Sequence, residues 1–132
     1  MNKSILLISA VCIGMAATAV TAVPYWRPAK GTVALTFDDG PNAKDTPQIL
    51  DVLKREHVQA TFFVLGSFAK KHPKLLRRMQ REGHAVSSHS MWHPNLKKLS
   101  ERKLKYQVVA SRDIISRILG KKIRCLRPPF GE

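Results

Sequence analysis

The sequence predicts an α/β fold built on a parallel sheet. Short runs rich in β-branched and aromatic residues alternate with longer stretches whose apolar residues recur at helical spacing. Strands separated by helices pair in parallel through right-handed crossovers. Polar clusters also follow three of the expected strands, at the edge of a parallel sheet where binding sites form. The 132 residues provide room for one domain.

The first half of the chain contains two expected strands and one helix. Residues 32–37 form the first strand. A helix begins at Asp45, whose side chain can cap it, with Pro47 in its first turn. Apolar residues at helical spacing continue this helix to about Glu56, and residues 58–65 form the second strand.

The second half repeats this alternation. A helical stretch over residues 67–83 is interrupted at Pro73 and ends at a glycine. Residues 85–88 form a short third strand. A long helix over residues 100–120 begins at a serine cap and ends at a glycine, and residues 123–126 form the fourth strand.

Residues 1–22 are predicted to be a signal peptide. Lys3 makes the start positive, an almost continuous apolar run follows, and small residues precede the expected cleavage site before Val23. The chain would then be exported, as a secreted, periplasmic or cell-wall-associated protein without a stable membrane span. Because the run is close to spanning length, an uncleaved membrane anchor is the alternative. Residues 23–31 are predicted to be a linker, which leaves 32–132 as the domain.

The charge of the chain limits the classes of partner that it can bind, and its cysteine count limits its disulfide bonds. The net charge of +14 favours anionic surfaces such as cell-wall polymers. Nucleic acid is excluded as a partner, because the chain is expected to be exported and its basic residues lack the interleaved aromatics that stack bases. Once residues 1–22 are removed, Cys125 is the single cysteine, so no intramolecular disulfide is expected.

Three polar clusters should meet at one end of the sheet. Asp38 and Asp39 end the first strand, His89 and His93 follow the third, and Arg127 follows the fourth. Two histidines and one carboxylate are a common ligand set of hydrolytic metal sites. A lone histidine is more often a surface or core residue, and we interpret the remaining histidines in that way: His57, His72 and His84.

The quoted clusters also resemble those of a known family. The stretches TFDDG (36–40), HSMWHP (89–94) and RPPFG (127–131) resemble, in order and approximate spacing, the first three motifs of the polysaccharide deacetylases. This is the NodB-homology domain of carbohydrate esterase family 4, and the resemblance covers residues 32–132. It implies a parallel-stranded, distorted (β/α) barrel, here incomplete.

The resemblance implies a role for each cluster. Asp39, His89 and His93 would bind a divalent metal, commonly zinc, with cobalt or manganese as alternatives. Asp38 would be the general base that activates water, and Arg127 would hold and orient it. The compensating charges would explain why two carboxylates can stand side by side.

Three further residues take supporting roles by the same resemblance. The backbone N–H of Phe130 would stabilise the oxyanion, and Pro128 would stiffen the substrate-binding loop around it. Ser90 would fix the histidine loop without touching metal. Trp92 is interpreted as a loop packing residue, with sugar stacking as the alternative. The reaction implied is hydrolysis of the N-acetyl amide of a polysaccharide, peptidoglycan or chitin-like, with release of acetate.

Members of this family continue past the third motif, where a histidine that protonates the leaving amine is found. We therefore expect this chain to be the N-terminal part of such a domain, with strand 123–126 as an unpaired apolar edge and with little activity alone. The alternative is a catalytically inactive remnant that binds metal or glycan. A two-histidine-one-carboxylate iron oxygenase is disfavoured, because those enzymes use a different, antiparallel architecture.

Overall fold

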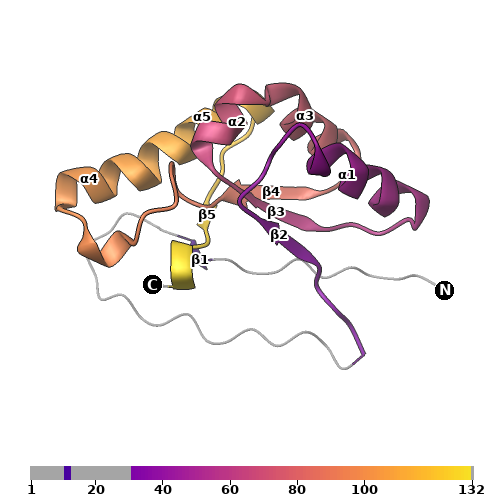
Figure 1. Cartoon of the computed structure of the whole chain (residues 1–132), viewed down its shortest axis with the longest axis horizontal. Coiled ribbons are helices and arrows are strands. Elements are labelled where there is room, and N and C mark those ends of the chain that lie inside the picture. Colours follow the sequence, from indigo (N-terminus) through magenta and orange to yellow (C-terminus); the bar gives the residue numbers. More distant parts are fainter. Residues whose placement is uncertain (1–10, 13–30, 132) are drawn as a thin grey trace.

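The computed structural model describes residues 11–12 and 31–131. Five strands form one sheet in the order β1-β5-β4-β3-β2. In Figure 1 the helices lie together above this sheet, so one face of the sheet is covered by helices. The pairs β2·β3, β3·β4 and β4·β5 are parallel, which confirms the predicted α/β class with a parallel sheet.

The first two predicted strands are both shorter in the structure than expected. Strand β2 is Thr36–Asp38, helix α1 is Asp45–Arg55 and strand β3 is Thr61–Val64. The predicted cap of α1 is wrong, because Asp45 already lies inside the helix. Instead, the Asn42 side-chain oxygen accepts hydrogen bonds from the backbone N–H groups of Lys44 and Asp45, at 3.0 and 2.6 Å. These bonds satisfy two N–H groups at the helix start.

The helical stretch that follows is divided as expected. Helix α2 is Gly66–Lys71, helix α3 is Pro73–Arg81, and strand β4 is Ala85–Ser88. Pro73 begins α3 at a position where its missing N–H costs no helical hydrogen bond.

The predicted long helix contains an interruption. A short 3₁₀ helix at Leu96–Lys98 precedes α4, Glu101–Lys105, and α5 is Ser111–Leu119. Between α4 and α5 the helical backbone continues as a π-helical turn, Tyr106–Ala110, called the π turn below. Ser100 stands at the N-cap, but its side chain makes no capping hydrogen bond.

The expectation of an unpaired edge at residues 123–126 is wrong. Strand β5 is only Cys125–Leu126, and it pairs with β4 on one side and antiparallel with β1, Val11–Cys12, on the other. An exposed strand edge offers unpaired backbone groups to another strand, which explains this pairing. The rest of the predicted signal peptide and linker lies outside the described residues, apart from Gly31.

The core lies between the sheet and the helices. Phe62 and Val64 of β3 point towards the helices, and Phe37 of β2 stacks on Phe62 with ring centroids 5.1 Å apart. The other buried residues of this core come from α1, α2, α3 and α5 and from segments in or beside β3, β4 and β5. They are Leu50, Leu53, Ala60, Ala69, Leu76, Met79, Val86, Ile115, Leu119 and Ile123. Alternation along β3 leaves Phe63 pointing to the opposite face of the sheet.

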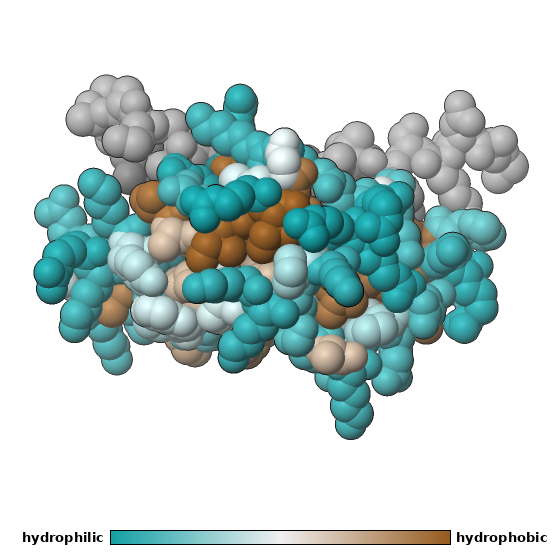
Figure 2. Space-filling view, turned by 90° about the horizontal axis from the view of Figure 1, so that it is seen from above, coloured by the Kyte–Doolittle hydropathy of each residue, from teal (hydrophilic) through white to brown (hydrophobic). Residues whose placement is uncertain are grey.

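The outer surface of the helix layer is mainly hydrophilic, with apolar residues gathered in one area near its middle (Figure 2). Exposed basic residues lie along α2 and α3, namely Lys70, Lys71, Lys74, Arg77 and Arg81. Among the described residues, no helix combines the length and apolar content needed to cross a membrane.

Gly66 allows α2 to approach the chain beside it. A Cβ at this position would lie 2.7 Å from the Met91 sulfur and 2.8 Å from the Ser111 Cα, and backbone cannot move aside cheaply. We therefore expect Gly66→Ala to lower the free energy of unfolding by about 1–3 kcal/mol through overpacking. Urea denaturation measures the change, with Ser67→Ala in the same helix as the control. Equal stability of the two variants would contradict the close approach.

Buried His84 makes stability depend on pH. Its side chain is 1% exposed, its Nδ1 accepts a hydrogen bond from the Ala60 N–H at 3.2 Å, and its Nε2 lies 4.0 Å from Glu82. Burial lowers the pKa of His84 below its ordinary value of 6.5, against the raising effect of Glu82 and with a further lowering by Arg78. The folded chain therefore takes up this proton less readily than the unfolded chain does.

We expect the free energy of unfolding to fall as pH decreases below about 6.5, because the unfolded state binds the extra proton. For this single group, the free energy of unfolding changes by at most about 1.4 kcal/mol per pH unit. His84→Asn keeps an acceptor near the Ala60 N–H but does not titrate, so its slope should be flatter. Urea denaturation at pH 5.5, 6.0 and 7.0 measures both proteins, and identical slopes would contradict this role of His84.

Candidate metal centre

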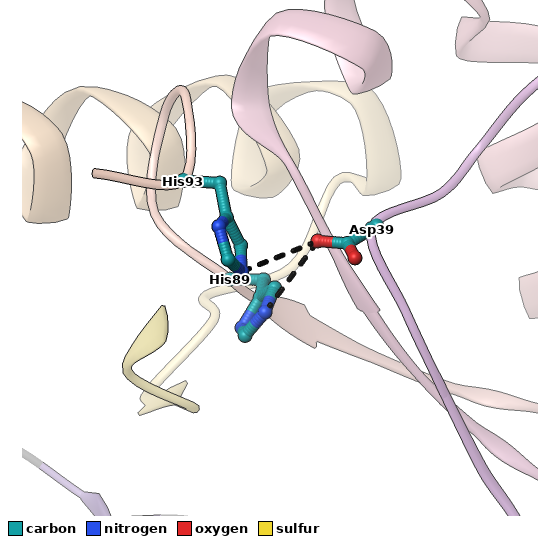
Figure 3. Close-up of side chains that lie close together, drawn as sticks. All are labelled: Asp39, His89 and His93. Carbon is teal, nitrogen blue, oxygen red and sulfur yellow. Dashed lines mark ion pairs between the residues drawn. The ribbon is translucent and has the colours of Figure 1, made fainter. Parts of the chain in front are cut away.

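Three predicted ligands meet at one edge of the sheet. Asp39 follows β2, His89 follows β4, and His93 lies in the loop that leaves β4 (Figure 3). Their side chains point toward one another, although 50 residues separate Asp39 from His89 along the chain. The parallel pairing of β2, β3 and β4 brings their carboxyl ends together, as the sequence pattern predicts.

The ligand atoms converge without being bonded to one another. The Nε2 atoms of His89 and His93 each lie 3.6 Å from the Asp39 Oδ1, and the three ligand atoms lie within 4.8 Å of one another. The His89 side chain is buried, that of His93 is 29% exposed and that of Asp39 is 62% exposed. The cluster is therefore open to solvent on the aspartate side.

A hydrogen bond fixes the orientation of His89. Its Nδ1 lies 2.8 Å from the backbone carbonyl oxygen of Arg127. When Nδ1 carries the proton and donates it to that oxygen, Nε2 keeps its lone pair and faces Asp39. Such a backbone partner on the second ring nitrogen is typical of metal-binding histidines. The donor set of two imidazole nitrogens and one carboxylate oxygen therefore fits a divalent metal such as zinc.

The loop that carries the histidines has an unusual backbone. Ser90 and His93 both have positive φ, 71° and 59°, and so does Asp39, at 67°. Such angles are uncommon for residues other than glycine and persist where the surroundings hold them. Ser90 is fully buried, and its Oγ accepts a hydrogen bond from the His93 N–H at 3.0 Å. This contact is the kind of support predicted for Ser90.

The same loop contacts a residue that the sequence interpretation missed. The Oε1 of Gln107 accepts hydrogen bonds from the N–H groups of Met91 and Trp92, at 3.1 and 3.0 Å. A signal was present in the sequence, because Gln107 precedes Ser111, Ile115 and Leu119 at intervals of four and all four are buried. A glutamine on a buried helix stripe needs a hydrogen-bond partner.

The neighbouring carboxylate has the predicted partner. Arg127 Nη1 lies 2.7 Å from the Asp38 Oδ1 and also donates to the Thr36 Oγ at 3.1 Å. The guanidinium lies over the Phe63 ring, 3.9 Å from its centroid. These contacts place Asp38 and Arg127 on the sheet face opposite the helices, beside the candidate metal centre. The two adjacent aspartates thus have different surroundings.

The third motif, residues 127–131, also contacts the candidate metal centre. Phe130 has a φ of 59° within the short 3₁₀ helix Pro129–Gly131, and its side chain is largely exposed. Its ring meets the His93 ring edge-on at 4.7 Å between centroids. Pro129 is buried, and the Pro128 carbonyl accepts a hydrogen bond from the Gly131 N–H at 3.2 Å. The loop therefore borders the candidate metal centre.

Four other residues considered from the sequence are not among the converging ligands. Trp92 is 57% exposed and packs against Tyr106, with ring centroids 5.2 Å apart. His57 follows α1, His72 lies between α2 and α3, and His84 precedes β4. None of these three histidines belongs to the group of potential metal ligands found among the described residues.

Comparisons with known proteins agree with this arrangement. The polysaccharide deacetylase family model matches residues 26–132. A peptidoglycan-N-acetylglucosamine deacetylase of Bacillus cereus is 46% identical over 103 residues, and a chitooligosaccharide deacetylase of Sinorhizobium fredii is 46% identical over 101 residues. The solved structure of the peptidoglycan deacetylase PdaC from Bacillus subtilis matches with a TM-score of 0.72 and 49% identity.

The matches cover most of this chain and less than half of each of these relatives. They include 78% of the chain and 38% of the Bacillus cereus protein, and 76% of the chain and 47% of the Sinorhizobium fredii protein. The PdaC structure is matched over 74% of this chain and 48% of that one. With the family model matching all three motif regions, the chain belongs to the polysaccharide deacetylase family.

Proposed function

We propose that this chain forms the metal-binding and base-bearing part of an enzyme that hydrolyses the N-acetyl amide of a polysaccharide and releases acetate. One observation carries the proposal. The ligand cluster of Asp39, His89 and His93 lies at the same sheet edge as the ion pair between Asp38 and Arg127. A hydrolase needs both an activated water and a group that takes its proton.

Asp39, His89 and His93 would hold the divalent metal, with zinc as the proposed ion because two imidazoles and one carboxylate are a common zinc set. A metal bound there would polarise the amide carbonyl and lower the pKa of a bound water towards neutrality. Cobalt and manganese are the alternatives. The exposure of Asp39 leaves the centre accessible to a polymeric substrate.

Asp38 is proposed as the general base. Its Oδ1 is held by the Arg127 guanidinium, which balances its charge beside Asp39. Thr36 and the Phe63 ring in turn fix the guanidinium, so the carboxylate has a defined direction. The other oxygen of Asp38 is then the natural acceptor for a proton from the attacking water.

The third motif is proposed to bind the reacting acetamide. The Phe130 ring contacts the His93 ring, so the loop that carries the backbone N–H of Phe130 borders the candidate metal centre. A backbone N–H so placed stabilises negative charge that develops on the carbonyl oxygen. Pro128 and the buried Pro129 limit the conformations of this loop, and Pro128 would contact the substrate beside it.

The substrate is proposed to be an N-acetylated cell-wall polymer, with peptidoglycan ahead of chitin oligomers. Relatives in both classes are 46% identical to this chain, and the net charge of +14 favours an anionic wall. We also propose export with cleavage before Val23. N-terminal sequencing of the exported protein would start at Val23, whereas a retained Met1 would contradict cleavage.

Acetate release tests the activity. The 132-residue chain is assayed alone and also extended by the part of the Bacillus cereus relative beyond the matched region, with N-acetylglucosamine oligomers as substrate. We expect the extended protein to release acetate. This release should stop when a chelator removes the metal and should return when zinc is added. Metal binding without acetate release from the extended protein would instead support the non-catalytic metal- or glycan-binding alternative.

A further inference from the structure

The loop between His89 and His93 rests on the π turn. In Figure 1 the chain that leaves β4 runs below the helix formed by α4 and α5 before it enters α4. We infer that Gln107 is a positioning residue that holds this loop in the conformation required for metal binding. The inference rests on the proposed metal centre, but part of its test does not require metal.

The contact is made by one buried oxygen. Gln107 Oε1 accepts hydrogen bonds from the adjacent N–H groups of Met91 and Trp92, at 3.1 and 3.0 Å. Gln107 and Met91 are 7% and 6% exposed, so solvent has little access to replace these bonds. Loss of the acceptor would leave the buried Met91 N–H unpaired, which costs more than the loss of an exposed hydrogen bond.

The opposite side of the loop is held by α2. The N–H of Gly66 donates to the Ser90 carbonyl at 3.0 Å, and the N–H of Ser67 donates to the Met91 carbonyl at 3.2 Å. Together with Gln107, these contacts hold the loop from both sides. The first residues of α2 bind its carbonyls, and the π turn binds its N–H groups.

The loop needs such restraint because its backbone is strained. Ser90 and His93 adopt positive φ, and no glycine stands between His89 and His93 to relieve it. The direction of the His93 imidazole depends on this backbone, since only a few single bonds separate the ring from it. A relaxed loop would move the His93 Nε2 away from Asp39 and leave His89, which has its own bond to the Arg127 carbonyl, in place.

Two consecutive residues of the π turn, Tyr106 and Gln107, contact this loop. π-helical turns widen a helix locally and occur often at functional sites. Here Tyr106 packs on the Trp92 ring from the solvent side, while Gln107 binds the loop backbone from the buried side. In this structure the π turn thus brings a ring and an amide oxygen to the same two residues of the loop.

The test compares two substitutions of Gln107. Gln107→Met keeps the length of the side chain but removes the acceptor, and Gln107→Glu keeps an acceptor oxygen. Gln80→Met is the matched control, because Gln80 Nε2 donates to the Leu119 carbonyl at 3.1 Å, away from the loop. Zinc affinity is measured by competition with a chelator, Co²⁺ coordination by its visible spectrum, and loop order by amide hydrogen exchange of the metal-free chain.

We expect Gln107→Met to bind zinc about 10–100-fold more weakly, as is typical when a residue supporting metal ligands is lost. Its Co²⁺ spectrum should change, and the amides of Met91 and Trp92 should exchange faster. Gln107→Glu and Gln80→Met should stay within about threefold of the parent affinity, well below the effect expected for a lost support.

Unchanged zinc affinity in Gln107→Met would overturn the inference, and so would equal loss in Gln107→Glu. If Gln107→Met does not fold, the parent chain decides, because unprotected Met91 and Trp92 amides would show that Gln107 does not hold the loop. If the parent binds no zinc, the proposed function fails. The exchange rates of the metal-free variants still show whether Gln107 orders the loop.

Discussion

His89→Ala and His93→Ala are each expected to weaken zinc binding by more than about 100-fold, because each removes a direct ligand, a larger loss than that of a supporting residue. The Nε2 atoms of both rings converge on the Asp39 Oδ1 at 3.6 Å, so neither has a substitute nearby in the described part of the chain. With two ligands left, the site should not retain zinc against a chelator of moderate strength.

Elemental analysis of the purified 132-residue chain measures this directly. We expect about one equivalent of zinc in the parent and little in either variant, since each keeps only two of the three ligands that a site of this kind requires. His72→Ala is the matched control, because it removes an imidazole between α2 and α3. One equivalent of zinc retained in both ligand variants would show that these histidines do not form the metal site.

The position of the candidate site could be predicted from the sequence, because it depends on topology. A helix between two neighbouring strands favours parallel pairing, and parallel pairing places residues that follow β2 and β4 at the same edge. Asp39, His89 and His93 meet there as expected. Arg127 follows β5 and reaches the Asp38 carboxylate by the same logic.

The supports of the site could not be predicted in the same way. A π turn has no strong local sequence signal, so the position of Gln107 against Met91 and Trp92 depends on how the helix packs. Asn42 competes with Asp45 as a helix cap, and only the turn geometry decides between them.

The pairing of β5 with β1 could also not be predicted from the sequence. Strand β1 has only two residues, and they lie within the apolar segment predicted to be a signal peptide. Hydrophobic periodicity cannot be recognised over two residues. Its antiparallel pairing with β5 depends on which backbone edge is left open by the rest of the fold.

Asp38→Asn is expected to lower acetate release by about 10²–10⁴-fold, the typical contribution of a general base. Asparagine has the same shape and keeps an oxygen that can accept the Arg127 hydrogen bond, now 2.7 Å long. It cannot take a proton from water at neutral pH. Because Asp38 is not among the converging ligand atoms, the zinc affinity of the variant should remain near that of the parent.

The extended protein is used for this measurement, with acetate release and zinc content determined on the same preparation. Asp113→Asn is the matched control, because Asp113 also pairs with an arginine, Arg112, at 2.8 Å, but on the exposed part of α5. Loss of activity with zinc retained separates a base from a ligand, since a ligand variant loses both. Activity equal to the parent would assign proton transfer to another group, whereas loss of zinc would make Asp38 part of the metal site and leave the base unidentified.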